Sequence, residues 1–493
     1  MQVDIRPTTR LRGATPVDVP ACIGPVLEAL CASTVDLSRL RVVCDWIQYK
    51  DNFREVIDVR QVLSPSAAPD LPVVRPLHEA AVEVAVDLRR CAEVDITGTV
   101  ADLLSNRKAA RRIYLEECKP GRESCIWGFN SLYWQALSLW EEATGRAYEQ
   151  ALPGGESDAR NTGAVRELIG ELFTVWDGLS ARNSLPDELY VVELGVGNGS
   201  QARTFLDEFV ALDTAHGSDY YRRLHYLMGD YSPRVLKLAQ AAVAAHGSHV
   251  SSLVIDATQP ATALSFLRYK AFLVYISNVY DNLPTDEIAS IGGRIYRVDV
   301  RAYLPAAAAG QIAERTGTEP DALPGLVEKL LRLGPELISE AMPANFATVD
   351  AAVDFWRDSW AALRLEERYT PLEGLDRYEI APRVTGEALR PLLEAEGDIR
   401  LQVSNGAVAS FVGTLPLLHP YGRIQCHDLF VTDLHQYQSG FHGPGKYDGS
   451  VVNWVNGPLL ELIGTRRGFD VLFAPFAHRT GTSIKTLTAQ VRD

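Results

Sequence analysis

Three alternating glycines form the part of the sequence with the clearest chemical meaning. Residues 191–200 read VVELGVGNGS, so a strand-like apolar run leads into Gly195, Gly197 and Gly199 and then into a helical pattern. Glycine adopts positive φ and lets a ligand approach the backbone closely. The helix that follows offers unpaired N–H groups at its N-terminus. The segment therefore predicts a site for a nucleotide-like cofactor, with a ligand-free tight turn as the simpler alternative.

The spacing of these glycines distinguishes two kinds of cofactor site. A dinucleotide-binding loop has the pattern G-x-G-x-x-G, which requires a third glycine at position 200. This chain has Ser200 there, and an acid, Glu193, stands just before the loop. The pattern E-x-G-x-G-x-G resembles the first motif of class I methyltransferases. That resemblance implies S-adenosylmethionine as the cofactor, with Glu193 near its amino-acid portion.

Two more acids follow the next two expected strands. Asp230 ends the segment YLMGD and is followed by Tyr231 and Ser232, while Asp256 ends LVID and is followed by Ala257. A carboxylate in the first position can accept hydrogen bonds from both ribose hydroxyls. The resemblance to class I methyltransferases implies that the second acid reaches the adenine amino group. We expect all five residues to contact S-adenosylmethionine, the alternative being ordinary solvated turns.

Three further segments narrow the resemblance. Residues 277–284, SNVYDNLP, resemble the Asn-Glu-x-x-Asp-x-Leu-Pro segment of the MidA-type methyltransferases, the group that contains the mitochondrial complex I assembly methyltransferase. Residues 161–172 resemble that family's helix ahead of the glycine loop, and residues 445–450, GKYDGS, resemble its Gly-x-x-Asp-x-Thr element. The resemblance covers roughly residues 125–300 and 415–493. It implies a class I fold and, in one branch of the family, methylation of a protein arginine.

The chain departs from the family where the acceptor is expected. Ser277 and Asn278 stand where the family has Asn-Glu. A carboxylate can pair with a guanidinium through two parallel hydrogen bonds, and an amide cannot replace that pairing. Because they directly follow the fourth expected strand, Ser277 and Asn278 are predicted to line the cofactor site. We also expect the acceptor to be a small molecule or modified peptide methylated on oxygen or nitrogen, with arginine as the alternative.

Methyl transfer needs little acid–base catalysis by the protein. The cofactor supplies the electrophile, so the protein positions the nucleophile and, where needed, removes a proton. Asp281 follows the fourth expected strand and is predicted to be the base or to orient the acceptor; the alternative is a helix N-cap. Tyr280 is expected to form a wall of the pocket. His427, followed by Asp428, is a second candidate for catalysis, and a core histidine is the alternative.

Short apolar runs alternate with helical patterns around these motifs. This alternation predicts an α/β fold with a parallel, doubly wound, Rossmann-like sheet. Residues 126–304 and 400–493 are expected to form the class I core, residues 305–399 a helical insertion acting as a substrate lid, and residues 1–125 an accessory region. In detail, we expect strands at 40–44, 56–62, 399–403 and 408–412, and helices at 78–91, 323–333 and 349–363.

Composition excludes several classes of function. The net charge of -15 argues against a nucleic-acid-binding protein, because phosphate binding needs a surplus of Lys and Arg. The seven cysteines are odd in number and lack a CxxC pair, which predicts no metal site and reduced thiols, as in a cytoplasmic protein. Neither a signal peptide nor a membrane span is expected. A homo-oligomer is compatible with the sequence. Two other functions stay open: a nicotinamide-dependent oxidoreductase and a catalytically silent partner protein that binds S-adenosylmethionine.

Overall fold

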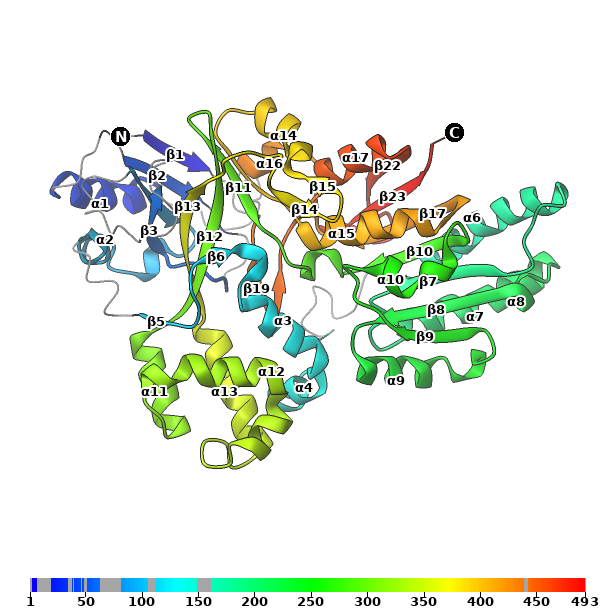
Figure 1. Cartoon of the computed structure of the whole chain (residues 1–493), viewed down its shortest axis with the longest axis horizontal. Helices are drawn as coiled ribbons and strands as arrows, with labels where there is room; N and C mark the ends of the chain where they lie inside the picture. Colours follow the sequence, from blue (N-terminus) through cyan, green and yellow to red (C-terminus); the bar gives the residue numbers. More distant parts are fainter. Residues whose placement is uncertain are drawn as a thin grey trace.

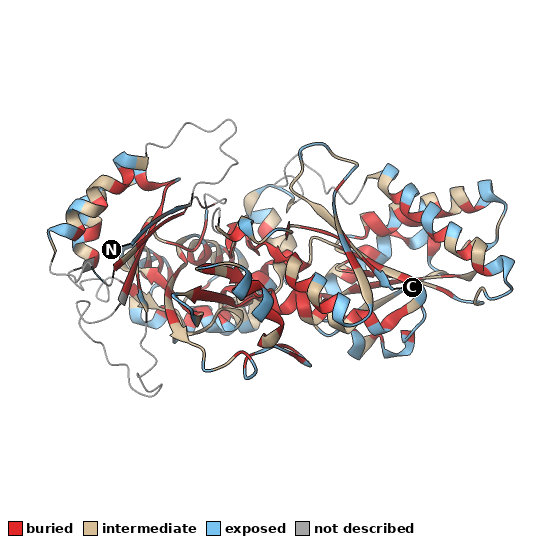
Figure 2. Cartoon of the chain, turned by 90° about the horizontal axis from the view of Figure 1, so that it is seen from above, coloured by how far each residue is buried: buried red, intermediate tan, exposed pale blue. Residues whose placement is uncertain are grey.

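The computed structural model describes residues 2–6, 19–33, 38, 40–45, 47, 51–62, 81–104, 112–148, 161–438 and 442–492. Two large sheets share the chain, one at each side of Figure 1, with a group of helices below and between them. Figure 2 shows that the strands and the inner sides of the helices are buried, whereas the outer sides of the helices are exposed.

The seven-stranded sheet contains the glycine loop. Its order is β22-β23-β17-β10-β7-β8-β9, and all strands run parallel except β23, which pairs antiparallel with both neighbours. The strands are β7 (Leu189–Leu194), β8 (Leu224–Asp230), β9 (Val250–Val254), β10 (Ala271–Ser277), β17 (Leu418–Asp428), β22 (Phe469–Pro475) and β23 (Lys485–Val491). The chain proceeds outward from β7 to β9 and then returns to place β10 on the other side of β7. A ligand crevice is expected at this reversal, outside the carboxyl ends of β7 and β10.

Helices cover both faces of this sheet, which confirms the predicted Rossmann-like α/β fold. Apolar residues of α6 (Thr162–Ala181) and α7 (Ser200–His216) pack on one face, and those of α15 (Asn405–Thr414) and α17 (Gly457–Arg466) pack on the other. Short helices α8 (Tyr220–Arg223), α9 (Pro233–Ala242) and α10 (Pro260–Ala263) complete the connections. The antiparallel β23 between β17 and β22 distinguishes this sheet from the all-parallel 3-2-1-4-5-6 order of the dinucleotide-binding fold.

The second sheet joins the N-terminal region to the insertion. Its main order is β1-β2-β4-β3-β13-β12-β11-β16, and β5 and β6 also pair with β12. The strands are β1 (Gln2–Arg6), β2 (Leu40–Asp45), β3 (Ile57–Val62), β4 (Ala81–Asp87), β5 (Arg112–Tyr114), β6 (Lys119–Pro120), β11 (Glu287–Ile291), β12 (Arg294–Pro305), β13 (Arg364–Pro371) and β16 (Ile399–Gln402). Helices α1 (Val19–Cys31) and α2 (Ile96–Leu104) pack on its N-terminal strands.

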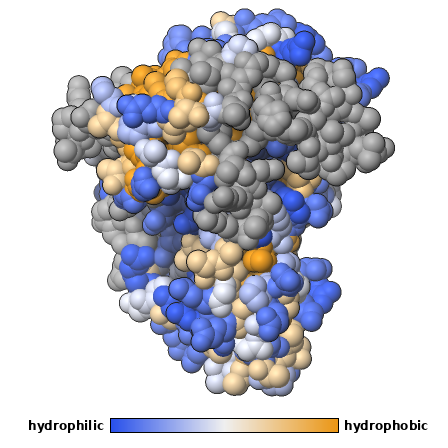
Figure 3. All heavy atoms as spheres, turned by 90° about the vertical axis from the view of Figure 1, so that its left-hand side faces the viewer, coloured by the Kyte–Doolittle hydropathy of each residue, from blue (hydrophilic) through white to orange (hydrophobic). Residues whose placement is uncertain are grey.

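A group of helices lies below the left-hand sheet in Figure 1, with α3 (Ile126–Gln135) and α4 (Leu137–Thr144) toward the middle of the picture. It also contains α11 (Ala306–Thr316), α12 (Leu323–Ala341) and α13 (Val349–Ala362), which share one hydrophobic core with α3 and α4. The remaining elements are short: β14 (Glu379–Ala381), β15 (Val384–Thr385), α14 (Arg390–Ala395), β18 (Phe430–Val431), α16 (His435–Gln438), β19 (Gly445–Tyr447), β20 (Ser450–Val452) and β21 (Val455–Asn456). In Figure 3, which shows the left-hand side of Figure 1, the most hydrophobic residues gather in the upper part of the face.

The boundaries of the N-terminal region, the insertion and the core differ from those predicted from the sequence. Residues 306–362 contain the expected insertion helices, but β13 and β16 follow them, and β11 and β12 belong to the second sheet rather than to the core. The N-terminal region is not separate, because β3 pairs with β13. Strand β13 was not predicted, because one of its buried side chains is Glu367, which is ion-paired with Arg54. Its sequence therefore lacks the alternation of apolar and polar residues that is typical of a half-buried strand.

Two other predictions of secondary structure were wrong. Residues 408–412, predicted as a strand, lie in helix α15. The prediction failed because this helix is buried on nearly every side, so its apolar residues show no helical period in the sequence. The described part of the expected helix at 78–91 contains strand β4, in which Val82, Val84 and Val86 recur at the spacing of a strand.

The expectation of reduced thiols was wrong for one pair of cysteines. Cys22 and Cys91 form a disulfide that joins α1 to the segment after β4. Distant cysteines reveal no pairing in a sequence, because pairing depends on the fold. In the described part of the chain, no helix is long and apolar enough to cross a membrane.

Candidate functional site: the carboxyl edge of the seven-stranded sheet

The glycine loop turns from β7 into α7 through three residues with positive φ. The φ angles of Gly195, Gly197 and Gly199 are 76°, 56° and 78°. A Cβ at Gly195 would lie 2.3 Å from the side chain of Val279, and one at Gly199 would lie 2.6 Å from the Cα of Ala239. A Cβ at Gly197 would meet nothing within 4 Å. The outer two glycines are therefore required by packing, whereas Gly197 faces open space that a ligand can occupy.

Asp230 connects this loop to the end of β8. Its Oδ1 accepts a hydrogen bond from the backbone N–H of Ser232 at 3.0 Å, and its Oδ2 accepts one from Gly197 at 3.4 Å. Burial raises the pKa of this carboxyl, and the backbone N–H donors lower it. A carboxylate has about four acceptor positions, so Asp230 retains capacity for two hydroxyl donors. This geometry suits the predicted ribose contact, beside the glycine of the loop that faces open space.

Glu193 lies in β7, two residues before the first glycine of the loop. It is 3% exposed, and its carboxyl accepts a hydrogen bond from Tyr226 Oη at 2.6 Å. Burial raises the pKa of Glu193 to about 8, with Tyr226 acting against that shift and Asp230 adding to it. The structure therefore places a mostly protonated acid just before the loop at neutral pH. Its contact with the cofactor's amino-acid portion stays a prediction.

Asp256 follows β9 and is exposed. Its Oδ1 accepts hydrogen bonds from the backbone N–H and the hydroxyl of Thr258, at 2.8 and 2.7 Å, so the side chain also stabilises a local turn. Ala257 beside it is half-buried. Both residues lie on the predicted edge of the sheet, and their contact with adenine stays a prediction.

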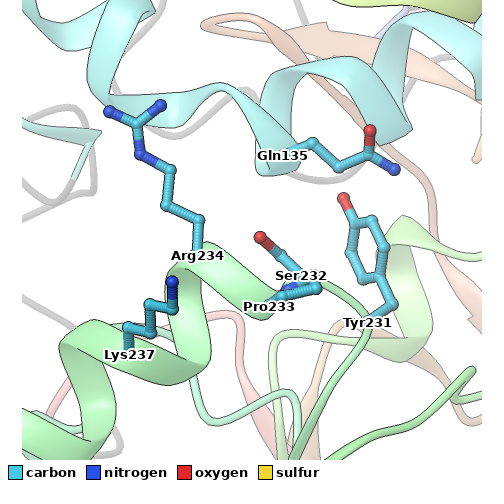
Figure 4. A pocket seen from close by; sticks show the side chains of 6 residues that line it. All are labelled: Gln135, Tyr231, Ser232, Pro233, Arg234 and Lys237. Carbon is cyan, nitrogen blue, oxygen red and sulfur yellow. The ribbon is translucent and has the colours of Figure 1, made fainter.

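An open pocket of about 680 Å³ adjoins Asp230. Figure 4 shows its lining: Gln135 from α3 on one side, and Tyr231, Ser232, Pro233, Arg234 and Lys237 from the start of α9 on the other. The hydroxyl of Tyr231 donates to the backbone oxygen of Ser131 in α3 at 2.9 Å, and Ser232 caps α9. Helix α3 thus forms the wall opposite the cofactor edge.

The loop after β10 begins with Ser277 and Asn278, both half-buried. Asn278 has a φ of 52°, and its backbone N–H donates to the carbonyl of His427 at 3.0 Å. Asparagine tolerates this left-handed conformation better than most residues with a Cβ. The backbone therefore gives a physical reason for asparagine at this position. The loop lies beside the glycine loop, because Val279 contacts Gly195.

The structure does not bring two of the predicted catalytic residues to the pocket. Tyr280 is 1% exposed and belongs to the hydrophobic core between the sheet and α15. His427 is buried, with Nδ1 at 2.9 Å from Thr486 Oγ1 and its ring packed edge-to-face on Phe476. His427 thus has the structural role given as its alternative, and Tyr280 lies in the core rather than in a wall of the pocket. Asp281 lies in the turn after the loop, 6% exposed, next to Asp428.

Sequence reasoning missed the contribution of α3. Asn130 of this helix donates to the backbone oxygen of Asn282 at 2.9 Å and accepts from the N–H of Val451, also at 2.9 Å. Trp134 donates from Nε1 to Asn282 Oδ1 at 3.2 Å. A signal was present, because buried polar Asn130 interrupts the otherwise aromatic helix sequence IWGFNSLYWQ.

The GKYDGS element fixes this wall from the other side. Asp448, at the turn between β19 and β20, accepts hydrogen bonds from Tyr133 at 2.9 Å, Trp140 at 3.1 Å and Arg146 at 2.9 Å. Lys446 is buried and donates to three backbone oxygens at the end of α13. The element therefore ties α3, α4 and the insertion together.

The comparisons with known proteins add only structural likenesses. No family model matches the chain, and no curated protein matches it. A Burkholderia thailandensis protein solved with S-adenosylhomocysteine bound is 13% identical, covers 78% of this chain and 89% of its own, and has a TM-score of 0.42. An uncharacterised protein from the same organism has the same identity and coverage and a TM-score of 0.41. A 1,6-didemethyltoxoflavin-N1-methyltransferase is 10% identical, with coverages of 67% and 89% and a TM-score of 0.25.

Proposed function

We propose that this protein is an S-adenosylmethionine-dependent methyltransferase with its cofactor at the carboxyl ends of β7 and β8. The observation that carries the proposal is the pairing of Gly197 with Asp230. The glycine faces open space at the reversal of strand order, and the carboxylate beside it retains acceptor capacity for ribose hydroxyls. A nicotinamide site is less well supported, because Ser200 replaces the third glycine of that motif and β23 interrupts the parallel sheet.

The residues of the crevice fit S-adenosylmethionine. Gly195, Gly197 and Gly199 would hold its amino-acid portion, Asp230 its ribose and Asp256 its adenine. When bound, this cofactor supplies an electrophilic methyl group on a sulfonium. The chain's own residues then position the acceptor: α3 closes the crevice opposite α9, and the loop from Ser277 to Asn282 borders it. Exclusion of water and alignment of the nucleophile are the main contributions that such a site makes.

We propose a small molecule or modified peptide, methylated on oxygen or nitrogen, as the acceptor. Asn278 offers no charge to hold a guanidinium. In addition, two cations from successive turns of α9 line the pocket: Lys237, and Arg234, whose charge Glu336 offsets in part. A permanently positive arginine side chain would be repelled there. Other acids of the site are already engaged, since Asp448 accepts hydrogen bonds from three side chains.

We propose that the insertion forms the outer wall of the acceptor site. Arg234 of α9 lies 3.8 Å from Glu336 of α12, and both side chains are more than half exposed. Such an exposed pair contributes about 0–1 kcal/mol, so it can open and close easily. The insertion helices also share a core with α3, so that a movement of α12 would reach the pocket wall.

Two assays test the function. Native mass spectrometry of the purified protein with S-adenosylmethionine and NAD present in equal amounts should show the former bound. Incubation with trideuteromethyl-labelled cofactor and a cell lysate should then give labelled small metabolites or peptides together with S-adenosylhomocysteine. Labelled methylarginine on a protein would overturn the proposed acceptor and leave the cofactor intact. Cofactor binding without any turnover would identify a silent binding protein.

A further inference from the structure

Two carboxyl groups meet beneath the loop that borders the proposed acceptor site. Asp428 is the last residue of β17, and Asp281 lies in the 3-10 turn Tyr280–Asn282 after β10. They are 0% and 6% exposed, and the backbone N–H of Asp281 donates to the carboxylate of Asp428 at 3.4 Å. Two carboxylates this close in a buried site cannot both ionise, so one of the pair carries a proton.

Asp428 is the ionised member of the pair. Its Oδ2 accepts hydrogen bonds from the backbone N–H groups of Val279 at 3.1 Å, Tyr280 at 2.8 Å and Asp281 at 3.4 Å. Its Oδ1 accepts one from Leu429 at 2.7 Å. These four N–H donors stabilise the negative charge, as backbone donors do for other buried carboxylates, and Oδ1, which has one of them, keeps room for a further donor. The same bonds hold the loop after β10 in place.

Asp281 therefore keeps the proton. Its Oδ1 accepts from Asn282 Nδ2 at 2.6 Å, which leaves the other oxygen to donate toward Asp428. Burial and the neighbouring Asp428 raise the pKa of Asp281 well above its ordinary value. The titratable groups that couple to the pair are the Cys426 thiol and the Tyr280 phenol, and the pKa of each is raised, so both stay neutral.

A hydrogen-bond chain runs from this pair to α3 in one direction. Trp134 Nε1 donates to Asn282 Oδ1 and Asn282 Nδ2 donates to Asp281, so the proton that Asp281 keeps completes the chain to the anion at Asp428. Successive bonds of the same polarity strengthen one another, and the terminal charge fixes the direction. A base at position 281 would reverse one link of this chain.

We propose that Asp428 is a positioning residue that keeps Asp281 protonated and, through Asn282, orients Trp134 on the wall of the acceptor site. Asp281 is then a hydrogen-bond donor rather than a general base. The protonation of Asp281 follows from these contacts and its burial, and only the role toward the acceptor rests on the proposed function. In this arrangement the acceptor must reach the site with a nucleophilic atom that needs no proton removal by Asp281.

The first test compares wild type with Asp281→Asn, because an amide donates and accepts in the same places as a protonated acid. A carboxyl that is protonated in the fold and ionised in the unfolded chain makes the unfolding equilibrium constant rise tenfold per pH unit. We expect the ratio of wild-type to Asp281→Asn unfolding constants to rise about a hundredfold between pH 5 and pH 7. A ratio independent of pH over that range would mean an ionised Asp281 and would overturn the proposal.

The second test uses Asp428→Asn and does not depend on the first variant. Infrared spectra at pH 7 should show the band of a buried protonated carboxyl in wild type, and this band should shift in Asp428→Asn, because Asp281 then donates to a neutral amide rather than to an anion. The indole N–H resonance of Trp134, assigned with Trp134→Phe, should shift in the same variant. An unchanged carboxyl band together with an unmoved indole resonance would refute the role of Asp428. Neither assay contains cofactor or acceptor, so their outcome is separable from a failure of the proposed function.

Discussion

Replacing Asp230 by alanine tests the cofactor site at the residue whose geometry suits it best. The carboxylate accepts hydrogen bonds from the N–H groups of Ser232 and Gly197, and its remaining acceptor positions can bind two ribose hydroxyls. A hydrogen bond to a charged group contributes about 1.5–3 kcal/mol, and 1.4 kcal/mol is a factor of ten in affinity. Loss of one such bond therefore weakens binding by roughly ten- to a hundredfold. If both hydroxyls bind equally well, the loss exceeds that range.

Isothermal titration with S-adenosylhomocysteine measures this loss directly. Asp187→Ala serves as the control, because that carboxylate is exposed and precedes β7 at its amino end, opposite the edge of the proposed site, so its loss should leave the affinity unchanged. Thermal unfolding of Asp230→Ala must show a folded protein, since the variant also frees the N–H of Gly197. The ribose contact requires an ionised Asp230, and burial raises the pKa of this carboxyl. When the solution is acidified, the affinity of wild type should therefore begin to fall at a higher pH than it would with an aspartate of ordinary pKa. Unchanged affinity in a folded Asp230→Ala protein would refute the ribose assignment.

Three other outcomes follow from the same geometry. Gly199→Ala should unfold at markedly lower denaturant concentration than Gly217→Ala, because both residues have positive φ but only the former would clash, at 2.6 Å from Ala239. The pKa of Glu193 is raised to about 8 in the fold, so wild type should lose stability as the pH rises from about 4.5 to 8. Glu193→Gln should not show this loss, and chemical denaturation across that pH range measures the difference. Asp448→Ala should lower the melting temperature and weaken acceptor binding more than cofactor binding, because three donors of the pocket wall lose their partner; equal losses for both ligands would contradict this.

The cofactor edge could be predicted from the sequence because its signals are local. Gly197 and Asp230 each follow a short apolar strand, and strands that alternate with helices place their carboxyl ends on one edge. The sequence could not separate the roles of the glycines. Gly195 and Gly199 are required by contacts with Val279 and Ala239, which are distant in the chain.

The rest of the site depends on contacts that no local pattern reveals. Asp281 was predicted as a base from its place after a strand, yet its environment is set by Asp428, 147 residues away. Tyr280 and His427 have chemically useful side chains, but burial in the core removes them from the pocket. In the second sheet, β2, β3 and β16 were predicted, but β13 was missed, because ion-paired Glu367 fills a buried position that an apolar residue usually occupies.

A crystal structure with S-adenosylhomocysteine bound tests the central claim most directly. We expect the amino-acid portion of the ligand along Gly195–Gly199, the ribose hydroxyls on the carboxylate of Asp230, and the sulfur directed toward the space between α3 and the loop that holds Asp281. A ligand bound elsewhere, or a crevice that accepts NAD and leaves S-adenosylhomocysteine in solution, would contradict the account.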